Sequence, residues 1–338
     1  MRVVQDLDRQ QWQTFVDGCA GASIFHTPEM HEVFALADGH TPELWAALGD
    51  DGQLLALFNP VAVTVLGGPL RYLTSRAVAF GSVLCAPGPE GKAALDELLH
   101  AYDRGRPIST IFTELRNVSQ LNGLRPVLDG RGYRHEEHLN FLIDLTQPEA
   151  KLWNGIRSNA RRNIRKAEAE GVVVAEMSGL EALPEVFTLL KAVYRRIQVP
   201  LPDESLFRAA LEVLKPRDML RVLVARESDA KDAPLIGAVM LLVYGGIMTY
   251  WYTGTLREYS ALRPSDLLVW RALQLGVATG CRCFDFGGGG RADEEYGVRD
   301  FKAKFGGELV NFGRDVRVHA PRRLSLSQAG YRLMRKYL

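Results

Sequence analysis

The sequence predicts a mixed α/β fold, made of two domains of similar construction. The chain has 338 residues, more than a single ordinary core accommodates. Apolar runs of strand length alternate with amphipathic runs of helical length along the whole chain. The order helix, helix, antiparallel meander, helix, strand, helix, strand occurs once in each half. This repeated order indicates a structural duplication.

The first half is predicted to hold three helices among several strands, because apolar residues recur there with helical or strand-like periods. The predicted helices are Arg9–Cys19, Pro28–Ala37 and Glu90–Asp103, and the predicted strands are Leu44–Leu48, Leu54–Val65, Leu70–Leu73, Ser109–Leu115 and Tyr133–Asp144. The Asp-Leu-Thr-Gln-Pro turn after the last strand is the best domain boundary. We therefore expect residues 1–145 to form the first domain and residues 146–313 the second.

The second half has clearer punctuation. Gly245 and Gly246 form a hairpin turn, Pro264 begins a helix, and Gly280 follows the end of that helix. The predicted helices are Glu149–Glu170, Leu180–Ile197, Ser205–Leu214, Pro264–Thr279 and Leu324–Leu338, and the predicted strands are Val172–Glu176, Leu220–Arg226, Leu235–Val243, Ile247–Thr253 and Cys281–Phe286.

Composition excludes several classes of protein. The chain is 47% hydrophobic and 24% charged, which is typical of a soluble folded protein and not of a disordered one. The four cysteines are far apart except for Cys281 and Cys283, whose side chains point to opposite faces of a strand, so reduced thiols are expected. No signal peptide and no apolar run of membrane-spanning length is present, which predicts a cytoplasmic location.

The net charge of +1 hides two basic segments. Lys151–Glu170 carries six basic and two acidic residues, and Arg314–Leu338 carries seven basic and one acidic. Within the first segment Arg157, Arg161 and Arg165 recur at every fourth position, which lines guanidinium groups along one helix face at a spacing suited to successive phosphates. This row predicts binding of tRNA or of a nucleotide phosphate, and a solvated helix face is the alternative.

The most informative segments are Phe284–Gly290 and Phe301–Gly307. The first places four glycines directly after an apolar strand, where backbone can approach a ligand closely. The second places Lys302 between phenylalanines, and a fixed cation there suits an anionic or acyl group. Gly287–Gly290 lacks the Lys-Ser/Thr of a phosphate-binding loop, so an ATP site is not expected.

These segments resemble the Fem family of transferases. The resemblance rests on Tyr252–Trp270, on the Phe-Asp-Phe-Gly-Gly strand end and on Phe301–Glu308, and a further match is the helix Leu152–Ala167 with Gly171-Val172 beyond it. It covers most of residues 140–313, and the first domain matches more loosely. The resemblance implies two tandem domains of the GNAT acyltransferase type without a helical-arm insertion, the first domain being completed by residues 314–338.

The resemblance also implies a reaction. Family members transfer an amino acid from aminoacyl-tRNA to the side-chain amine of a peptidoglycan precursor, with no cofactor other than the activated donor. The glycine-rich loop that holds the coenzyme A pyrophosphate in other GNAT enzymes is absent between Tyr252 and Trp270. Two alternatives stay open: an acyl-CoA-dependent N-acyltransferase acting on a sugar or exopolysaccharide precursor, and a non-catalytic protein that binds tRNA or a peptide.

Three residues are candidates for the chemistry. Lys302 would stabilise the negative charge that develops when an amine attacks a carbonyl. Glu114, which corresponds to the acidic residue lining the family's cleft, or Asp285, at a strand end, would accept the proton that the amine loses. For both carboxylates a structural role that caps nearby amides is the alternative.

Further residues are candidates for binding. The acceptor site is expected to include Tyr194 and Arg196, whereas the helix after Pro28 has no basic residue except His31, which argues against a UDP-linked acceptor. No metal site is expected. The predicted donor-binding residues are Arg157, Arg161, Arg165, Tyr252, Phe301 and Lys304.

Overall fold

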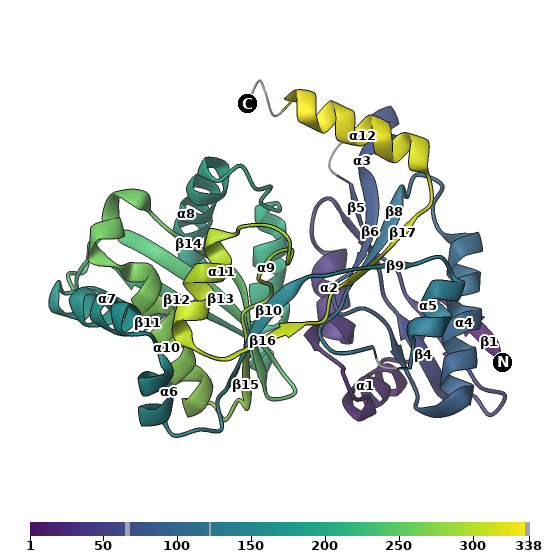
Figure 1. Cartoon of the computed structure of the whole chain (residues 1–338), viewed down its shortest axis with the longest axis horizontal. Coiled ribbons are helices and arrows are strands. Elements are labelled where there is room, and N and C mark those ends of the chain that lie inside the picture. Colours follow the sequence, from purple (N-terminus) through teal and green to yellow (C-terminus); the bar gives the residue numbers. More distant parts are fainter. Residues whose placement is uncertain (65–67, 122, 335–338) are drawn as a thin grey trace. The chain divides into compact units, whose positions relative to one another are not determined.

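The computed structural model describes residues 1–64, 68–121 and 123–334. The chain divides into two compact units: residues 1–137 with 312–338 form unit 1, and residues 138–311 form unit 2 (Figure 1). It therefore passes from unit 1 into unit 2 and returns. A mixed α/β fold is confirmed for both units.

Unit 1 holds a four-stranded sheet of order β1-β3-β4-β7 and a six-stranded sheet of order β2-β5-β6-β8-β17-β9. The strands are β1 (Arg2–Val4), β2 (His40–Pro42), β3 (Trp45–Leu48), β4 (Leu54–Phe58), β5 (Val61–Thr64), β6 (Ser75–Ala79), β7 (Leu84–Cys85), β8 (Phe112–Arg116), β9 (Arg134–Glu136) and β17 (Arg314–Val318). The helices are α1 (Arg9–Gly18), α2 (Pro28–Ala35), α3 (Arg71–Thr74), α4 (Gly88–Gly105), α5 (Arg125–Gly130) and α12 (Pro321–Met334).

The core of unit 1 forms between its sheets and α4. Leu95, Leu98 and Leu99 recur at helical spacing on α4 and are fully buried, together with Leu115 of β8 and Tyr133. Because β6 and β8 are parallel and α4 lies between them in the sequence, these elements form a β-α-β crossover.

Unit 2 holds one seven-stranded sheet of order β11-β12-β13-β14-β15-β10-β16. The strands are β10 (Leu139–Asp144), β11 (Val173–Glu176), β12 (Leu220–Arg226), β13 (Leu235–Tyr244), β14 (Ile247–Thr255), β15 (Cys283–Asp285) and β16 (Glu308–Asn311). The helices are α6 (Glu149–Gly155), α7 (Ser158–Ala169), α8 (Leu183–Arg196), α9 (Glu204–Val213), α10 (Pro264–Ala278) and α11 (Gly297–Lys302).

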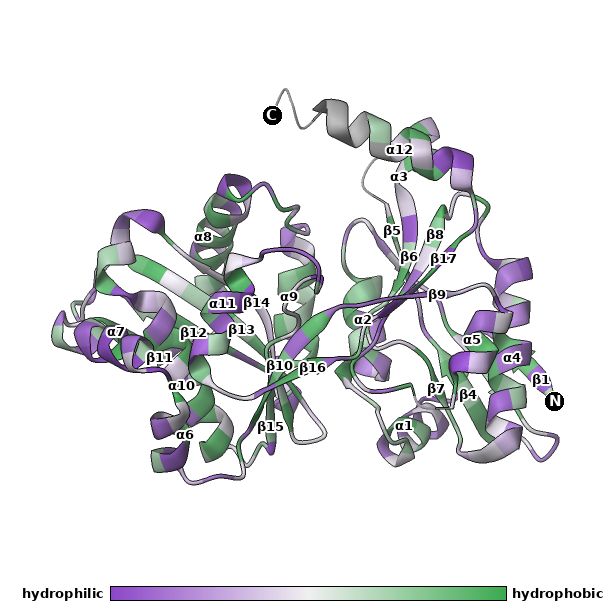
Figure 2. Ribbon diagram, in the orientation of Figure 1, coloured by the Kyte–Doolittle hydropathy of each residue, from purple (hydrophilic) through white to green (hydrophobic). Residues whose placement is uncertain are grey.

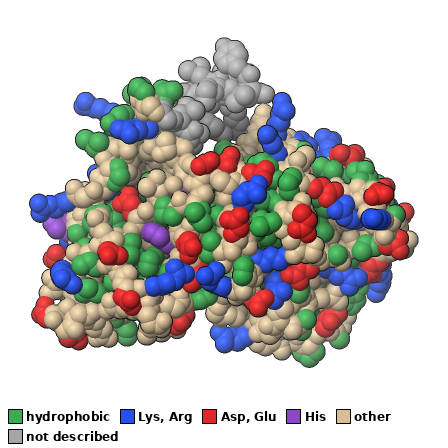
Figure 3. Space-filling view, turned by 180° about the vertical axis from the view of Figure 1, so that it is seen from behind, with side chains coloured by type: hydrophobic (Ala, Val, Ile, Leu, Met, Phe, Trp, Pro, Cys, Tyr) green, Lys and Arg blue, Asp and Glu red, His purple; other side chains and the backbone are tan. Residues whose placement is uncertain are grey.

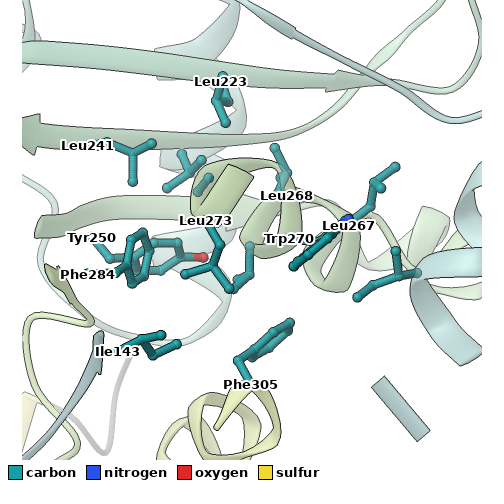
Figure 4. Packing of buried hydrophobic residues seen from close by; sticks show 14 of the residues in the cluster. Ile143, Leu223, Leu241, Tyr250, Leu267, Leu268, Trp270, Leu273, Phe284 and Phe305 are labelled. Carbon is teal, nitrogen blue, oxygen red and sulfur yellow. The ribbon is translucent and has the colours of Figure 1, made fainter. Parts of the chain in front are cut away.

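Helices cover both faces of the sheet of unit 2. A Cβ atom on Gly254 of β14 would meet side chains of α8. Gly237 of β13 pairs with Thr255, the residue after Gly254, so it faces the opposite side of the sheet. A Cβ atom there would meet Leu268 of α10. The buried residues of α10 pack against aromatic residues of the sheet and Phe305 (Figure 4). Apolar colouring follows these strands, whereas α7 is mainly hydrophilic (Figure 2). The parallel pair β14 and β15, joined through α10, matches the crossover of unit 1.

The prediction of one long strand over Tyr133–Asp144 was wrong. The segment forms two strands, of which β9 pairs with β17 in unit 1 and β10 pairs with β15 and β16 in unit 2. The division between the units therefore falls at residues 137 and 138, not at the predicted 145 and 146. Alternating apolar residues continue through both strands, so the sequence pattern does not show where the chain changes sheets.

Three other segments differ from their predictions. Leu70–Leu73 lies in a short helical segment, and the strand begins at Ser75. The predicted strand Leu54–Val65 is divided at Asn59-Pro60, as expected where proline removes a backbone donor, and its last residue lies outside the described part of the chain. The predicted helix Glu149–Glu170 is broken between Gly155 and Ser158 into α6 and α7.

The last segment, Leu324–Leu338, is helical as far as Met334, and its final residues lie outside the described range. The longest described helix of unit 2 is α10, with 15 residues, so the described part of unit 2 contains no long helical arm. No described helix is both long and apolar enough to cross a bilayer.

Candidate functional site

The parallel strands β14 and β15 frame the candidate site in unit 2. Their register covers Ile247–Thr249 of β14 only, after which β14 continues along β13 to Thr255. The register of β14 against β13 shifts at Trp251: Tyr250 and Tyr252 pair with neighbouring residues of β13, and Trp251 between them forms a β-bulge. Where β15 ends, the chain turns away through the glycines 287–290. The carboxyl ends of these strands thus hold an irregular turn of the kind that lines ligand sites in α/β proteins.

The backbone of the turn at residues 287–290 adopts conformations that favour glycine. Gly287, Gly288 and Gly290 have φ values of +71°, +133° and +80°. A Cβ atom on Gly287 would lie 2.8 Å from the carbonyl oxygen of Tyr250. The backbone of the turn therefore packs directly against β14.

Lys302 is buried behind this turn, with 9% of its surface exposed. Its Nζ donates hydrogen bonds of 2.7 Å to the carbonyl oxygens of Phe286 and Gly288, and it lies 5.8 Å from the ring centre of Tyr250. Burial lowers the pKa of Lys302 to about 8, and the carboxylate of Asp285 opposes that shift. Since an ammonium group has three N–H bonds and two are used within the described residues, one N–H is left for a ligand.

Asp285 and Asn140 complete the network around the turn. Asp285 Oδ1 accepts hydrogen bonds from Asn140 Nδ2 at 2.6 Å and from Gly287 N at 2.7 Å, and Asn140 Oδ1 accepts one from Gly288 N at 2.8 Å. Burial raises the pKa of Asp285, and these hydrogen bonds oppose the shift. Asp285 therefore caps the turn, while its predicted role as a base stays a prediction. Sequence reasoning missed Asn140, because nothing local marks a polar residue in an apolar strand.

The structure brings two predicted donor residues together. The backbone N–H of Arg157 donates to the carbonyl oxygen of Lys304 at 2.8 Å, which ties the start of α7 to the segment that carries Lys302. Lys304 Nζ lies 5.6 Å from the ring centre of Phe301, which packs against the core of unit 2. The basic helix and the lysine segment are therefore neighbours within unit 2.

The predicted arginine row lies on α7, but its members differ in environment. Arg157 is exposed just before the helix. Arg161 Nη1 donates to the carbonyl oxygens of Trp153 and Asn154 at 3.4 and 3.2 Å, so it caps the end of α6. Arg165 is exposed and lies 5.4 Å from the ring centre of Trp153. Arg161 thus has a structural partner, while Arg157 and Arg165 present charge to solvent.

The tyrosines Tyr252 and Tyr194 lie in an aromatic cluster between β14 and the helices α8 and α9. Their ring centres are 6.0 Å apart, and Tyr252 also contacts Phe207 edge-on at 4.9 Å. Burial raises the pKa of Tyr194 to about 12. Arg196 is exposed in the last turn of α8. The two tyrosines therefore serve packing, and a binding role for Tyr194 and Arg196 stays a prediction.

Glu114 belongs to unit 1, on β8. Its Oε1 accepts hydrogen bonds from Arg116 Nε at 2.8 Å and from Arg314 Nη1 at 2.7 Å. Burial alone would raise the pKa of Glu114, but these two guanidinium groups lower it below its usual value. A carboxylate with a lowered pKa is a weak base, so this environment argues against the predicted catalytic role. The arginine partners of Glu114 were not predicted from the sequence.

Comparison with known proteins gives a consistent assignment. Residues 154–302 match the family model of the acetyltransferase (GNAT) domain. Among solved structures, FemX superposes with a TM-score of 0.71 at 15% identity, over 96% of this chain and 99% of that chain. The chain has the tandem GNAT fold of the Fem transferases. The predicted resemblance is therefore confirmed, and the family match makes residues 154–302 an N-acyltransferase domain.

Two further solved structures share this Fem-like fold. The C-terminal domain of a putative lysylphosphatidylglycerol synthetase from Agrobacterium fabrum has a TM-score of 0.57 at 14% identity, over 95% of this chain and 94% of that chain. A tandem GNAT protein from the clavulanic acid biosynthesis pathway has a TM-score of 0.60 at 13% identity, over 94% and 98%. A search of curated protein sequences finds no match.

Proposed function

We propose that this Fem-like chain transfers an amino acid from aminoacyl-tRNA to an amine of a peptidoglycan precursor. The observation that supports this donor is the start of α10, whose residues suit a coenzyme pyrophosphate poorly. Pro264 has no N–H to offer there, and the residue before it, Arg263, is in the left-handed region at φ +60°. The buried carboxylate of Asp266 lies in the first turn, where a phosphate would otherwise bind.

The charge of α7 supports a nucleic-acid donor. The exposed residues Arg157, Arg162 and Arg165 offer cations to a phosphate backbone, and Arg157 is tied by its backbone to the lysine segment. Lys302, with one N–H to spare, supplies a fixed positive charge for the carbonyl oxygen of an aminoacyl ester as an amine attacks. Positioning and charge stabilisation suffice for this reaction, because an ester is already an activated acyl group.

A second candidate is an acyl-CoA-dependent N-acyltransferase acting on a sugar or exopolysaccharide precursor. The observation that favours it is the family match of residues 154–302, since that family is described as acetyltransferases. Under this alternative the coenzyme phosphates need a position other than the start of α10.

A thermal-shift comparison of aminoacyl-tRNA with acetyl-CoA separates the two donors. We expect aminoacyl-tRNA to raise the melting temperature and acetyl-CoA to leave it unchanged. Stabilisation by acetyl-CoA alone would exclude the tRNA proposal. Stabilisation by tRNA without transfer of the amino acid to any amine acceptor would favour a non-catalytic tRNA-binding protein.

Charge-neutralising variants of α7 test the same proposal in more detail. Each of Arg157→Gln, Arg162→Gln and Arg165→Gln is expected to lower the slope of log affinity against log salt by about 1 if that residue contacts a tRNA phosphate. Arg208→Gln is the matched control, because Arg208 lies on α9 and pairs with Glu204. An equal change in the control would show that only net charge matters and that α7 is no binding surface.

A further inference from the structure

Three arginines surround one glutamate on a single face of the six-stranded sheet of unit 1. Arg76 lies on β6, Glu114 and Arg116 on β8, and Arg314 on β17. These strands are neighbours, and Arg314 is the register partner of Arg116. Leu115, between Glu114 and Arg116, belongs to the core that packs on α4, so strand alternation directs the four charged residues to the opposite face.

The positive charges of this cluster exceed what Glu114 neutralises. Arg116 and Arg314 both donate to the same oxygen of Glu114, Oε1. The Nε atom of Arg76 is shielded from solvent and has no hydrogen-bond partner among the described residues. Burial lowers the pKa of both Arg76 and Arg314, and the charge of Arg116 lowers each further. These groups therefore repel one another, and a second anion would relieve the repulsion.

A second carboxylate lies at the rim of the cluster. Glu136 of β9 is the register partner of Arg314 and acts on it electrostatically, but Glu136 is exposed and hence screened by solvent. With both carboxylates counted, three guanidinium groups face two negative charges. An excess of positive charge remains, and the side chains of Arg116 and Arg314 are 33% and 29% exposed, so a ligand can reach it.

We propose that this face of unit 1 binds a phosphate group of a small-molecule ligand. Guanidinium groups donate paired hydrogen bonds that match phosphate oxygens, and a phosphate carries enough negative charge to balance the excess. Phe80 lies 5.0 Å from the guanidinium of Arg116 and stacks on Phe34 of α2, so an apolar wall borders the cluster. The site goes beyond the proposed function, because it lies in the unit outside the acyltransferase match and does not depend on which donor is used.

Titration calorimetry of the full chain with inorganic phosphate tests the proposal, with acetate at equal ionic strength for comparison. We expect phosphate to bind and acetate to bind at least about tenfold more weakly, because it carries a single charge. Arg76→Gln should weaken phosphate binding about tenfold, whereas Glu114→Gln should strengthen it by removing the competing carboxylate. Arg9→Gln is the matched control in unit 1, since Arg9 pairs with Glu29 on the surface.

A second measurement does not depend on how well the variants fold. The side-chain Nε–H resonance of Arg76 in the wild-type protein should shift on addition of phosphate and stay in place on addition of acetate. Phosphate binding that is lost in Arg165→Gln and kept in Arg76→Gln would place the phosphate on α7 and overturn the proposal. An unshifted Arg76 resonance at saturating phosphate would overturn it as well.

Discussion

The two units place positive side chains beside a buried carboxylate in opposite ways. In unit 2 a single cation, Lys302, donates to two carbonyl oxygens and lies near Asp285, whose own oxygen is held by backbone and amide donors. In unit 1 three arginines lie around Glu114, and two of them share one of its oxygens. In the first arrangement most hydrogen bonds of the cation are made, while in the second the positive charges are in excess and Arg76 Nε has no hydrogen-bond partner among the described residues.

This difference separates positioning from binding. Lys302, which gives two of its three N–H bonds to backbone carbonyls, fixes the shape of a turn and keeps one N–H for a ligand. The cluster in unit 1, where three guanidinium groups face the carboxylates of Glu114 and Glu136, keeps an excess of positive charge. Positive and negative side chains are intermixed over the face drawn in Figure 3, as the net charge of +1 leads one to expect, so local clusters of this kind, not the overall charge, decide where anions bind.

The largest effect is expected at Lys302. Lys302→Met should reduce turnover about 1,000-fold, equal to about 4 kcal/mol, because the developing oxyanion loses its cation. Lys231→Met is the control, because Lys231 is an exposed lysine of the same unit between β12 and β13, and it should stay within about threefold of wild type. Single-turnover kinetics and tRNA affinity should be measured together. A loss of turnover fully explained by a loss of tRNA affinity would show that Lys302 binds the donor and does not stabilise the developing oxyanion.

The second prediction concerns pH. The pKa of Lys302 is lowered from 10.5 to about 8 in the folded protein, so between these values the unfolded chain holds a proton that the folded chain has released. Stability should therefore rise with pH across this window, by up to about 3 kcal/mol relative to Lys302→Met. Denaturant unfolding of the wild type and of Lys302→Met measures this change in stability. The two measurements are made at about the ends of the window, at about pH 7.5 and about pH 10.5. A constant difference between the two proteins would show that Lys302 keeps its ordinary pKa.

The sequence predicted the network of Lys302 and Asp285 in unit 2 better than the arginine cluster around Glu114 in unit 1. Lys302 stood out because phenylalanines and glycines surround it in one short segment, and the strand before the glycine turn was also expected. Arg76, Arg116 and Arg314 come from three strands that only the fold makes neighbours, so no local pattern links them. The same limit explains the missed change of sheet after β9, since strand alternation shows burial but not which sheet a strand joins.

The third prediction concerns the backbone that carries Lys302. Gly307 has φ +89°, and a Cβ atom there would lie 2.5 Å from the carbonyl oxygen of Leu142 on β10. Gly307→Ala should therefore cost about 2 to 3 kcal/mol of unfolding free energy, through backbone strain and a clash that no side-chain movement relieves. Gly280→Ala is the matched control, because Gly280 has φ +73° with open space around it, and it should cost about 1 kcal/mol. Equal costs in denaturant unfolding would show that the turn yields to the added methyl group.

The smallest predicted effect has the opposite sign and sharpens the contrast between the units. Arg76→Gln should raise the free energy of unfolding by about 0.5 kcal/mol, because it removes a half-buried guanidinium that Arg116 repels and whose shielded Nε has no hydrogen-bond partner among the described residues. High salt should diminish the gain, since screening weakens the repulsion in the wild-type protein. Saturating phosphate should reverse it, because the ligand stabilises the wild-type protein more than the variant. Denaturant unfolding at low salt, high salt and high phosphate measures all three, and a loss of stability at low salt would make Arg76 a structural member of a closed network like that of Lys302.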